Sequence, residues 1–203
     1  RAGGMVARPL QLAELAEDPY RWTDSLAARL RAAATPPLLV GWSMGAMVAL
    51  DALTRPAAPP AAGLLVLAGT LRFCRAPDWP FGQPPAAVRA LRRAVLRNAR
   101  EALAAFYRQV REPASAETLP MPAEPMSDPR QLAAALDLLA DLDLRDRPPP
   151  MCAVQWLHGD RDAVIPIEAG LESARCFGLT IEILPGAGHD LPGTHGMRVR
   201  DVL

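Results

Sequence analysis

The chain alternates between short apolar runs and segments in which apolar residues recur every three or four positions. The runs predict strands that helices cover on both faces, as in a parallel sheet. They lie at 38–40 and 63–69 and within the segments 151–159 and 179–190, each of which predicts a strand that ends in a polar loop. The recurring spacing predicts helices, and these lie at 22–35, 44–53, 130–142 and 167–176. Strands and helices that alternate in this way indicate the α/β class.

A different pattern fills the middle of the chain. Residues 71–87 are rich in proline and aromatic residues and predict irregular structure, and residues 112–130 predict a loop. Between them, over 88–111, apolar residues share one side, which predicts a long helix or a bent pair. We therefore expect a helical insertion within one α/β core. The predicted boundaries are 1–70 for the first part of the core, 71–147 for the cap and 148–203 for the second part.

Composition narrows the classes of function. At 203 residues the chain suits one domain with a substantial core. Its 22 basic and 22 acidic residues cancel, so no net charge attracts it to nucleic acid or to an anionic membrane. We find neither an apolar stretch of membrane-spanning length nor a signal peptide at the start. We therefore expect a cytoplasmic monomer that binds neither nucleic acid nor membrane.

Cysteine and histidine give no metal-binding pattern. Cys74, Cys152 and Cys176 are widely spaced and odd in number, which fits neither a disulfide framework nor a zinc site. The three histidines lack the paired spacing of a metal motif. We therefore expect no metal, no cofactor and reduced cysteines with structural roles.

Residues 41–45 have the sequence Gly-Trp-Ser-Met-Gly and lie between an apolar run and a helix. This G-x-S-x-G pattern in that context is typical of a nucleophile elbow, a sharp turn that exposes a serine. We expect both glycines to be required, because side chains flanking the serine would collide. Ser43 is the predicted nucleophile, and the backbone N–H of Met44 is a predicted oxyanion donor. The alternative is a glycine-serine turn without chemistry.

A serine nucleophile needs a base and an acid that orients the base, and after such an elbow they follow in the order acid, histidine. Asp160 and Asp162 both follow the third apolar run and compete as the acid. His189 follows the last run and is the predicted base. His195 is a rival base farther from the strand end, and a structural role suits His158.

These motifs and the segments between them resemble the pimeloyl-acyl-carrier-protein methyl ester esterases of biotin synthesis, a family of the α/β-hydrolase fold. The resemblance runs from about 38 to 189. It includes strings that hydrolase chemistry does not require: Phe73-Cys74, Asp78-Trp79-Pro80, Leu119-Pro120-Met121-Pro122 and Leu142-Asp143-Leu144-Arg145. The family pattern places the acid three residues after Gly159, which selects Asp162 and leaves Asp160 to brace the loop.

The resemblance implies a serine carboxylesterase that hydrolyses the methyl ester of pimeloyl-acyl-carrier protein beneath a helical cap. The acyl group would lie between cap and core, and Trp42, Phe106 and Trp79 are candidates to line it, although aromatic residues are more often core. The carrier protein would dock on basic cap residues. Six arginines share a sector of about 100° on the predicted cap helix: Arg89, Arg93, Arg97, Arg100, Arg108 and Arg111. An ordinary solvated helix face explains this stripe at least as well.

The chain departs from the family over residues 1–37, where we find neither the strands that precede the elbow nor the loop that donates the second oxyanion N–H. We therefore expect an α/β-hydrolase fold that lacks the N-terminal strands. One alternative function is a broad carboxylesterase or thioesterase for short acyl chains, because the triad does not select the substrate. Another is a non-catalytic truncated hydrolase that binds a partner.

Overall fold

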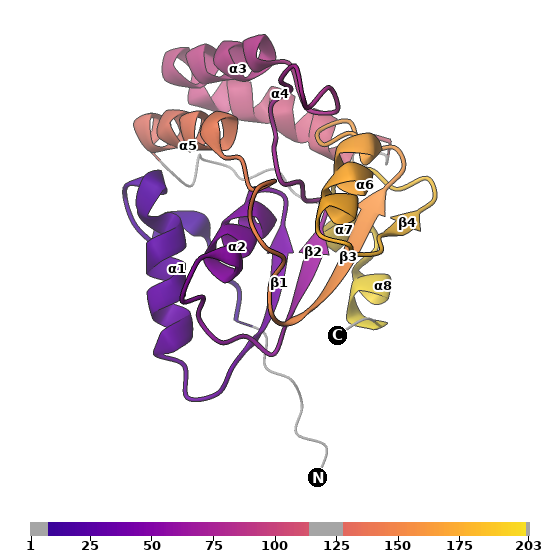
Figure 1. Cartoon of the computed structure of the whole chain (residues 1–203). Coiled ribbons are helices and arrows are strands. Elements are labelled where there is room, and N and C mark those ends of the chain that lie inside the picture. Colours follow the sequence, from indigo (N-terminus) through magenta and orange to yellow (C-terminus); the bar gives the residue numbers. More distant parts are fainter. Residues whose placement is uncertain (1–7, 114–127, 202–203) are drawn as a thin grey trace.

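The computed structural model describes residues 8–113 and 128–201 of the chain (Figure 1). Within these residues four strands form one parallel sheet in the order β1-β2-β3-β4. The strands are β1 Leu38–Trp42, β2 Gly63–Leu67, β3 Ala153–Gly159 and β4 Glu182–Leu184. Because the strands are parallel, their carboxyl ends meet at one edge of the sheet. The predicted α/β class with a parallel sheet is confirmed.

Helices flank the sheet and form a further layer beyond its carboxyl edge. The flanking helices are α1 Trp22–Arg31, α2 Met44–Thr54, α6 Ile167–Cys176, α7 Leu191–Thr194 and α8 Gly196–Asp201, with short 3-10 helices at Leu12–Glu14 and Pro19–Arg21. The further layer comprises α3 Pro85–Arg97, α4 Ala99–Arg111 and α5 Pro129–Asp141, at the top of Figure 1. In the described part of the chain, no helix is long and apolar enough to cross a membrane.

The segment 88–111 forms a bent pair of helices, one of the two structures that its spacing predicts. The break falls at Asn98, whose φ of −155° and ψ of 87° are not helical. The Asn98 side chain accepts a hydrogen bond from the Glu101 N–H at 3.2 Å, which caps the first turn of α4. Most of the predicted 112–130 loop, with the Leu119–Pro122 string, lies outside the described residues.

The core lies around β2, and β1 is less covered than its apolar run predicts. All five residues of β2 are buried, as expected for a strand with helices on both faces. In β1, however, Leu38 is 40% exposed and Val40 48% exposed. The prediction of a buried strand at 38–40 is therefore wrong for the described structure, because β1 lies at the edge of this sheet and pairs with β2 alone. The expected lack of N-terminal strands stays a prediction.

Two of the segments that carry the family resemblance, 78–80 and 142–145, pack together where the outer helical layer joins the core. Arg145 contacts Asp143 at 2.8 Å and Asp78 at 2.9 Å, and its guanidinium lies 5.4 Å from the centre of the Trp79 ring. Arg72 also pairs with Asp143. Burial opposes ionisation of Asp143, but the hydrogen bonds from Arg145 and Arg72 outweigh it and hold the pKa of Asp143 at about 2.

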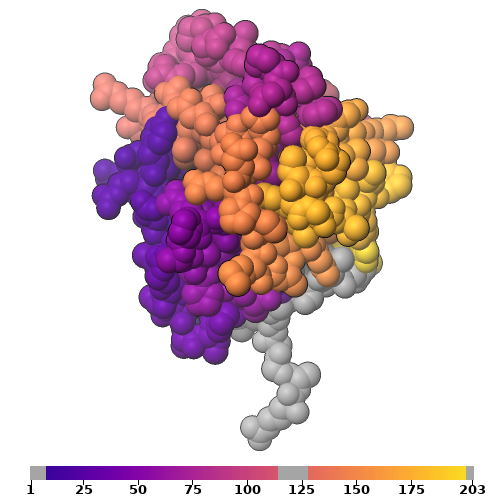
Figure 2. Space-filling view, viewed as in Figure 1, coloured from indigo at the N-terminus to yellow at the C-terminus, as the bar shows by residue number. Residues whose placement is uncertain are grey.

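Segments from both ends of the chain meet around this layer. In the space-filling view, the orange segment that includes α5 lies between the indigo N-terminal helices and the yellow C-terminal part (Figure 2). The Tyr20 hydroxyl is 3.0 Å from a carboxylate oxygen of Asp141, and the Gln131 amide donates to the carbonyl of Glu17 at 3.0 Å. The outer layer is therefore fixed on the core by contacts between residues that are far apart in sequence. The predicted domain boundaries stay a prediction.

Candidate active site

Ser43 occupies a strained turn between β1 and α2 at the carboxyl edge of the sheet. Its φ of 55° and ψ of −125° lie outside the regions that side chains ordinarily allow. The Ser43 N–H donates to the carbonyl of Leu67 at 2.9 Å, which attaches the turn to β2. The Ser43 hydroxyl does not cap α2, so Oγ is available for another partner. This geometry is that of the elbow that the G-x-S-x-G pattern predicts.

The two glycines of the elbow are not equivalent. A Cβ atom on Gly41 would lie 2.6 Å from the Cα and 2.9 Å from the N of Ala46, in the backbone of α2. A Cβ atom on Gly45 would meet nothing within 4 Å. The expectation that both glycines avoid a collision is therefore wrong. Only Gly41 lies beneath the first turn of α2, whereas the Cβ position of Gly45 points into open space.

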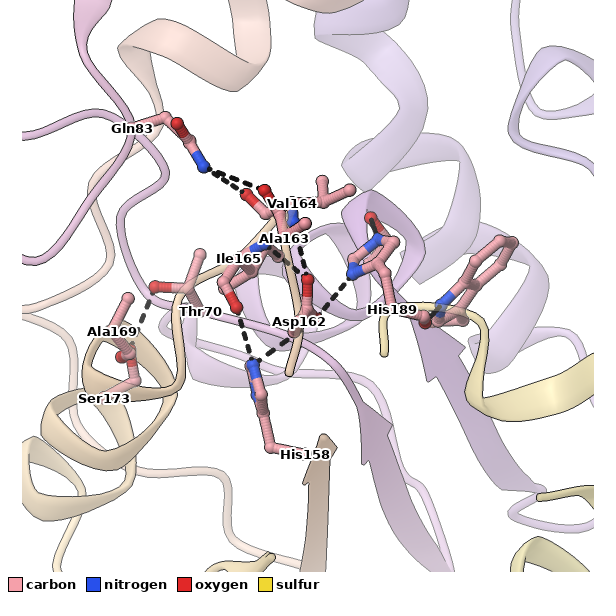
Figure 3. Close-up of polar contacts among 12 residues, drawn as sticks. Thr70, Gln83, His158, Asp162, Ala163, Val164, Ile165, Ala169, Ser173 and His189 are labelled. Atoms are coloured by element: carbon pink, nitrogen blue, oxygen red, sulfur yellow. Dashed lines mark hydrogen bonds and ion pairs between the residues drawn. The ribbon is translucent and has the colours of Figure 1, made fainter. Parts of the chain in front are cut away.

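A chain of hydrogen bonds joins Ser43, His189 and Asp162. His189 Nε2 is 2.8 Å from Ser43 Oγ, and His189 Nδ1 is 2.7 Å from Asp162 Oδ2. His189 is 1% exposed and Asp162 8% exposed. The serine follows β1, the aspartate follows β3 and the histidine follows β4, so the parallel sheet itself brings the three together. Figure 3 shows the contact between Asp162 and His189. In this arrangement the imidazole can accept the serine proton while the carboxylate holds its other nitrogen.

The structure distinguishes the two competing aspartates. Asp162 Oδ1 accepts hydrogen bonds from the N–H groups of Val164 and Ile165, both at 2.8 Å, which leaves Oδ2 for His189. Asp160 Oδ1 instead accepts from the Gly186 N–H at 2.6 Å. Asp162 therefore contacts the imidazole, while Asp160 braces the loop that leads to it.

The rival base is placed elsewhere. His195 Nδ1 is 2.8 Å from Thr194 Oγ1, at the end of α7. His158 is fully buried at the end of β3, and its Nε2 is 2.9 Å from the carbonyl oxygen of Ile165. Of the three histidines, His189 is the one that the structure places on Ser43.

Trp42 contacts the histidine loop, which sequence reasoning missed. Its Nε1–H donates to the carbonyl of His189 at 2.8 Å, and the two rings lie 5.5 Å apart between centres. Trp42 and Phe106 both pack against one apolar cluster that includes Trp79 and Val164. Trp79 itself is buried and belongs to the core of this cluster. That Trp42 and Phe106 line an acyl site stays a prediction.

Two glutamine amides, Gln83 just before α3 and Gln109 on α4, hold the loop after Asp162. The Gln83 amide donates to the carbonyl of Val164 at 2.9 Å, and the Gln109 amide donates to that of Ala163 at 2.7 Å. Figure 3 shows the contact of Gln83. Nothing in the sequence pattern indicates either contact, because each joins segments more than fifty residues apart.

Met44 is the first residue of α2, so its N–H lies among the groups that a helix leaves without an intrahelical acceptor. These groups carry the positive end of the helix dipole next to Ser43. A negative oxygen on a group attached to Ser43 would be stabilised at this position. That Met44 is an oxyanion donor stays a prediction.

The predicted arginine stripe is divided between two helices. Arg89, Arg93 and Arg97 are exposed on α3, and Arg100 and Arg108 are exposed on α4. The single sector assumed one continuous helix, and this assumption is wrong because the helix breaks at Asn98. In the part of the chain that the structure describes, no three side chains of His, Cys, Asp or Glu are grouped to hold a metal ion.

A strained serine elbow, a histidine on the serine and a carboxylate on the histidine, all at the carboxyl edge of a parallel sheet, define the class of α/β hydrolases. Residues 7–202 match the model of the alpha/beta hydrolase family, and the chain belongs to this family.

Individual relatives narrow this class. A pimeloyl-[acyl-carrier protein] methyl ester esterase of Methylococcus capsulatus is 36% identical over 193 residues, and the match covers 84% of this chain. One of Xylella fastidiosa is 31% identical over 180 residues, covering 78% of this chain. This chain spans 70% and 66% of the length of these two curated relatives. The resemblance inferred from the motifs is thus confirmed.

A solved structure supports the fold. The esterase EaEST from Exiguobacterium antarcticum matches with a TM-score of 0.74 at 18% identity, and the match covers 95% of this chain and 74% of that one. At this identity the likeness bears on the fold alone.

Proposed function

We propose that this chain is a serine carboxylesterase with Ser43 as nucleophile, His189 as base and Asp162 as the acid that orients it. The observation that carries the proposal is the pair of hydrogen bonds that joins these residues, at 2.8 Å and 2.7 Å. The family supports the same chemistry, because relatives that are 36% and 31% identical to this chain are named as ester hydrolases.

The reaction begins when His189 Nε2 accepts the proton of Ser43 and Oγ attacks the ester carbonyl carbon. The oxyanion that forms lies beside the N–H of Met44 at the start of α2. The tetrahedral intermediate collapses as His189 donates its proton to the departing alkoxide, and an alcohol leaves. Water, deprotonated by His189, then attacks the acyl-enzyme and releases the free acid and Ser43. Throughout, Asp162 stabilises the imidazolium and keeps Nδ1 protonated.

The substrate that we propose is the methyl ester of pimeloyl-acyl-carrier protein, the substrate named for the two relatives. The partly buried rings of Trp42 and Phe106 are joined in one apolar cluster with Val164, which suits an acyl chain. Exposed arginines on α3 and α4 suit an acidic carrier protein. We also propose a cytoplasmic monomer that binds neither nucleic acid nor membrane, for which the balanced charge is the support.

The second candidate is a broad carboxylesterase or thioesterase for short acyl chains. It is favoured by the observation that the hydrogen-bonded residues act on the ester group alone, so they select no acyl chain. The carrier-bound methyl ester should therefore be compared with a series of p-nitrophenyl esters. A much higher kcat/KM for the carrier-bound ester supports the first candidate, and equal or better use of short free esters supports the second.

The role of Ser43 is tested by Ser43→Ala. We expect kcat for any hydrolysed ester to fall by a factor on the order of 10³ or more. Labelling by a fluorophosphonate probe should be lost at the same time. A folded wild-type protein that neither turns over esters nor reacts with the probe would instead favour a non-catalytic, partner-binding chain.

Docking of the carrier protein is tested by Arg93→Glu on α3. The expected result is a higher KM for the carrier-bound ester and an unchanged KM for a p-nitrophenyl ester. An equal effect on both substrates would contradict docking at α3.

A further inference from the structure

His158 is a buried ionisable residue that the proposed reaction does not use. It is 0% exposed at the end of β3. Its Nε2 lies 2.9 Å from the carbonyl oxygen of Ile165 and 3.5 Å from Asp162 Oδ2. Figure 3 shows the ring on the side of Asp162 that is away from His189. The carboxylate of Asp162 is thus approached by two imidazoles, and only one of them contacts Ser43.

The surroundings determine the charge and the tautomer of His158. Burial lowers the pKa of His158 and outweighs the opposing attraction of Asp162, so the ring is neutral near pH 7. The titratable groups that face it are Asp162, His189 and Glu168. Because a carbonyl oxygen only accepts hydrogen bonds, the proton of the neutral ring is on Nε2. This N–H points toward both Ile165 and Asp162.

The other ring nitrogen is enclosed without a partner. Among the described residues, His158 Nδ1 is buried and makes no hydrogen bond. A Cβ atom on Gly170 would lie 2.6 Å from Nδ1, so α6 approaches the ring closely enough to exclude any side chain at that position. Burying an unpaired acceptor costs free energy that an apolar residue of similar size would not incur. A histidine that only filled space would therefore destabilise the fold relative to an apolar residue of similar size.

Ile165 links His158 to the acid through the backbone. The Ile165 N–H donates to Asp162 Oδ1 at 2.8 Å, while the Ile165 carbonyl accepts from His158. Holding Ile165 therefore also holds one of the two N–H groups that orient the carboxylate. A neutral donor can do this without placing a second positive charge on Asp162, which would weaken its effect on His189.

We propose that His158 is a positioning residue for the acid: its neutral Nε2–H fixes Ile165 and the carboxylate of Asp162, and so aligns Asp162 with His189. This inference rests on the proposed roles of Ser43, His189 and Asp162. His158 contacts no substrate and exchanges no proton in the reaction.

The test compares two variants of similar size that differ in the hydrogen-bond donor. His158→Gln keeps an amide N–H within reach of Ile165, and His158→Met removes the donor. For His158→Met we expect kcat to fall roughly tenfold, the effect of one lost hydrogen bond, with KM unchanged. We also expect the proton NMR signal of the His189 Nδ1–H to shift, because a misaligned Asp162 no longer holds this hydrogen bond at 2.7 Å. His158→Gln should restore both quantities.

Several outcomes would overturn the inference. A folded His158→Met enzyme with the wild-type kcat and the wild-type His189 Nδ1–H signal would do so. A folded His158→Gln enzyme that differs from the wild type in either quantity would also do so. The result for His158→Gln can refute the inference even if His158→Met does not fold. Failure of the proposed function is recognised separately, as wild-type turnover that Ser43→Ala does not reduce. In that case, the proton NMR signal of the His189 Nδ1–H that hydrogen-bonds to Asp162 still tests the inference. The same chemical shift in the wild type and in His158→Met refutes the positioning role.

Discussion

Replacing Gly41 by alanine should damage the elbow, while the same replacement at Gly45 should not. The new Cβ atom at position 41 would lie 2.6 Å from Ala46 Cα, whereas carbon atoms in contact are normally about 3.5–4.0 Å apart. The first turn of α2 must therefore move by about 1 Å. Because the atom that must move belongs to the helix backbone, rotation of a side chain cannot relieve the overlap.

The expected magnitudes follow from this geometry. Overpacking of this kind costs about 1–3 kcal/mol, and we expect Gly41→Ala near the upper end, with a melting temperature lower by about 6–12 °C. Gly45→Ala places a methyl group in open space within α2, where alanine favours the helix by up to about 1 kcal/mol. A displacement of Ser43 by about 1 Å from its position against His189 can also reduce kcat about a hundredfold, so Gly41→Ala should lose activity.

Urea unfolding of the wild type and both variants measures the stability difference. The midpoint should fall for Gly41→Ala and stay or rise for Gly45→Ala, with the same dependence of the free energy of unfolding on urea in all three. Hydrolysis of a p-nitrophenyl ester gives kcat for the same samples. The steric reasoning is refuted if both alanine variants shift the midpoint equally, or if Gly41→Ala is as stable as the wild type.

Two further predictions concern Trp42 and Asp143. Trp42→Phe keeps an aromatic ring but removes the hydrogen bond to the His189 carbonyl. We therefore expect steady-state kinetics to give a kcat up to about tenfold lower for every acyl length. A change in KM that depends on acyl length would indicate an acyl-binding role instead. The pKa of Asp143 is lowered from 3.8 to about 2 against the effect of burial, by hydrogen bonds from Arg145 and Arg72. Its ionised form therefore stabilises the fold above about pH 4, and this stabilisation is lost as the pH falls toward about 2. The difference in the free energy of unfolding between wild type and Asp143→Asn, measured in urea, should be present at about pH 6 and shrink between about pH 4 and pH 2. A difference that does not change with pH would contradict the role of the ionised carboxylate.

Most elements of the fold could be predicted because each depends on a local pattern. The apolar run at 63–69 predicts β2, and the recurring apolar positions at 167–176 predict α6, whose observed bounds are Ile167–Cys176. Strand and helix periods are local properties of the backbone, so they can be identified without knowledge of the rest of the molecule. The exposure of Leu38 and Val40 could not be predicted in this way, because it depends on what lies beside β1.

Ser43 and His189 were predictable because the elbow motif and the order of acid and base along the chain specify them. Ser43 stands in the G-x-S-x-G pattern, and His189 follows the last strand. The selection of Asp162 over Asp160 required the family pattern, because both residues follow β3 within one loop. Their different partners, His189 and Gly186, are established only when β4 is placed beside β3.

The sequence by itself determined the class of the fold, the order of its elements and the positions of Ser43 and His189, because period, turn chemistry and motif spacing are local patterns of the chain. The resemblance to the family added the choice of Asp162. Only the tertiary structure decided how those residues are held. Gln83 and Gln109 reach the acid loop across 81 and 54 positions of the chain, and His158 lies under Asp162 because α6 packs on β3 through Gly170. Such contacts depend on the distances between packed elements, which no local pattern encodes.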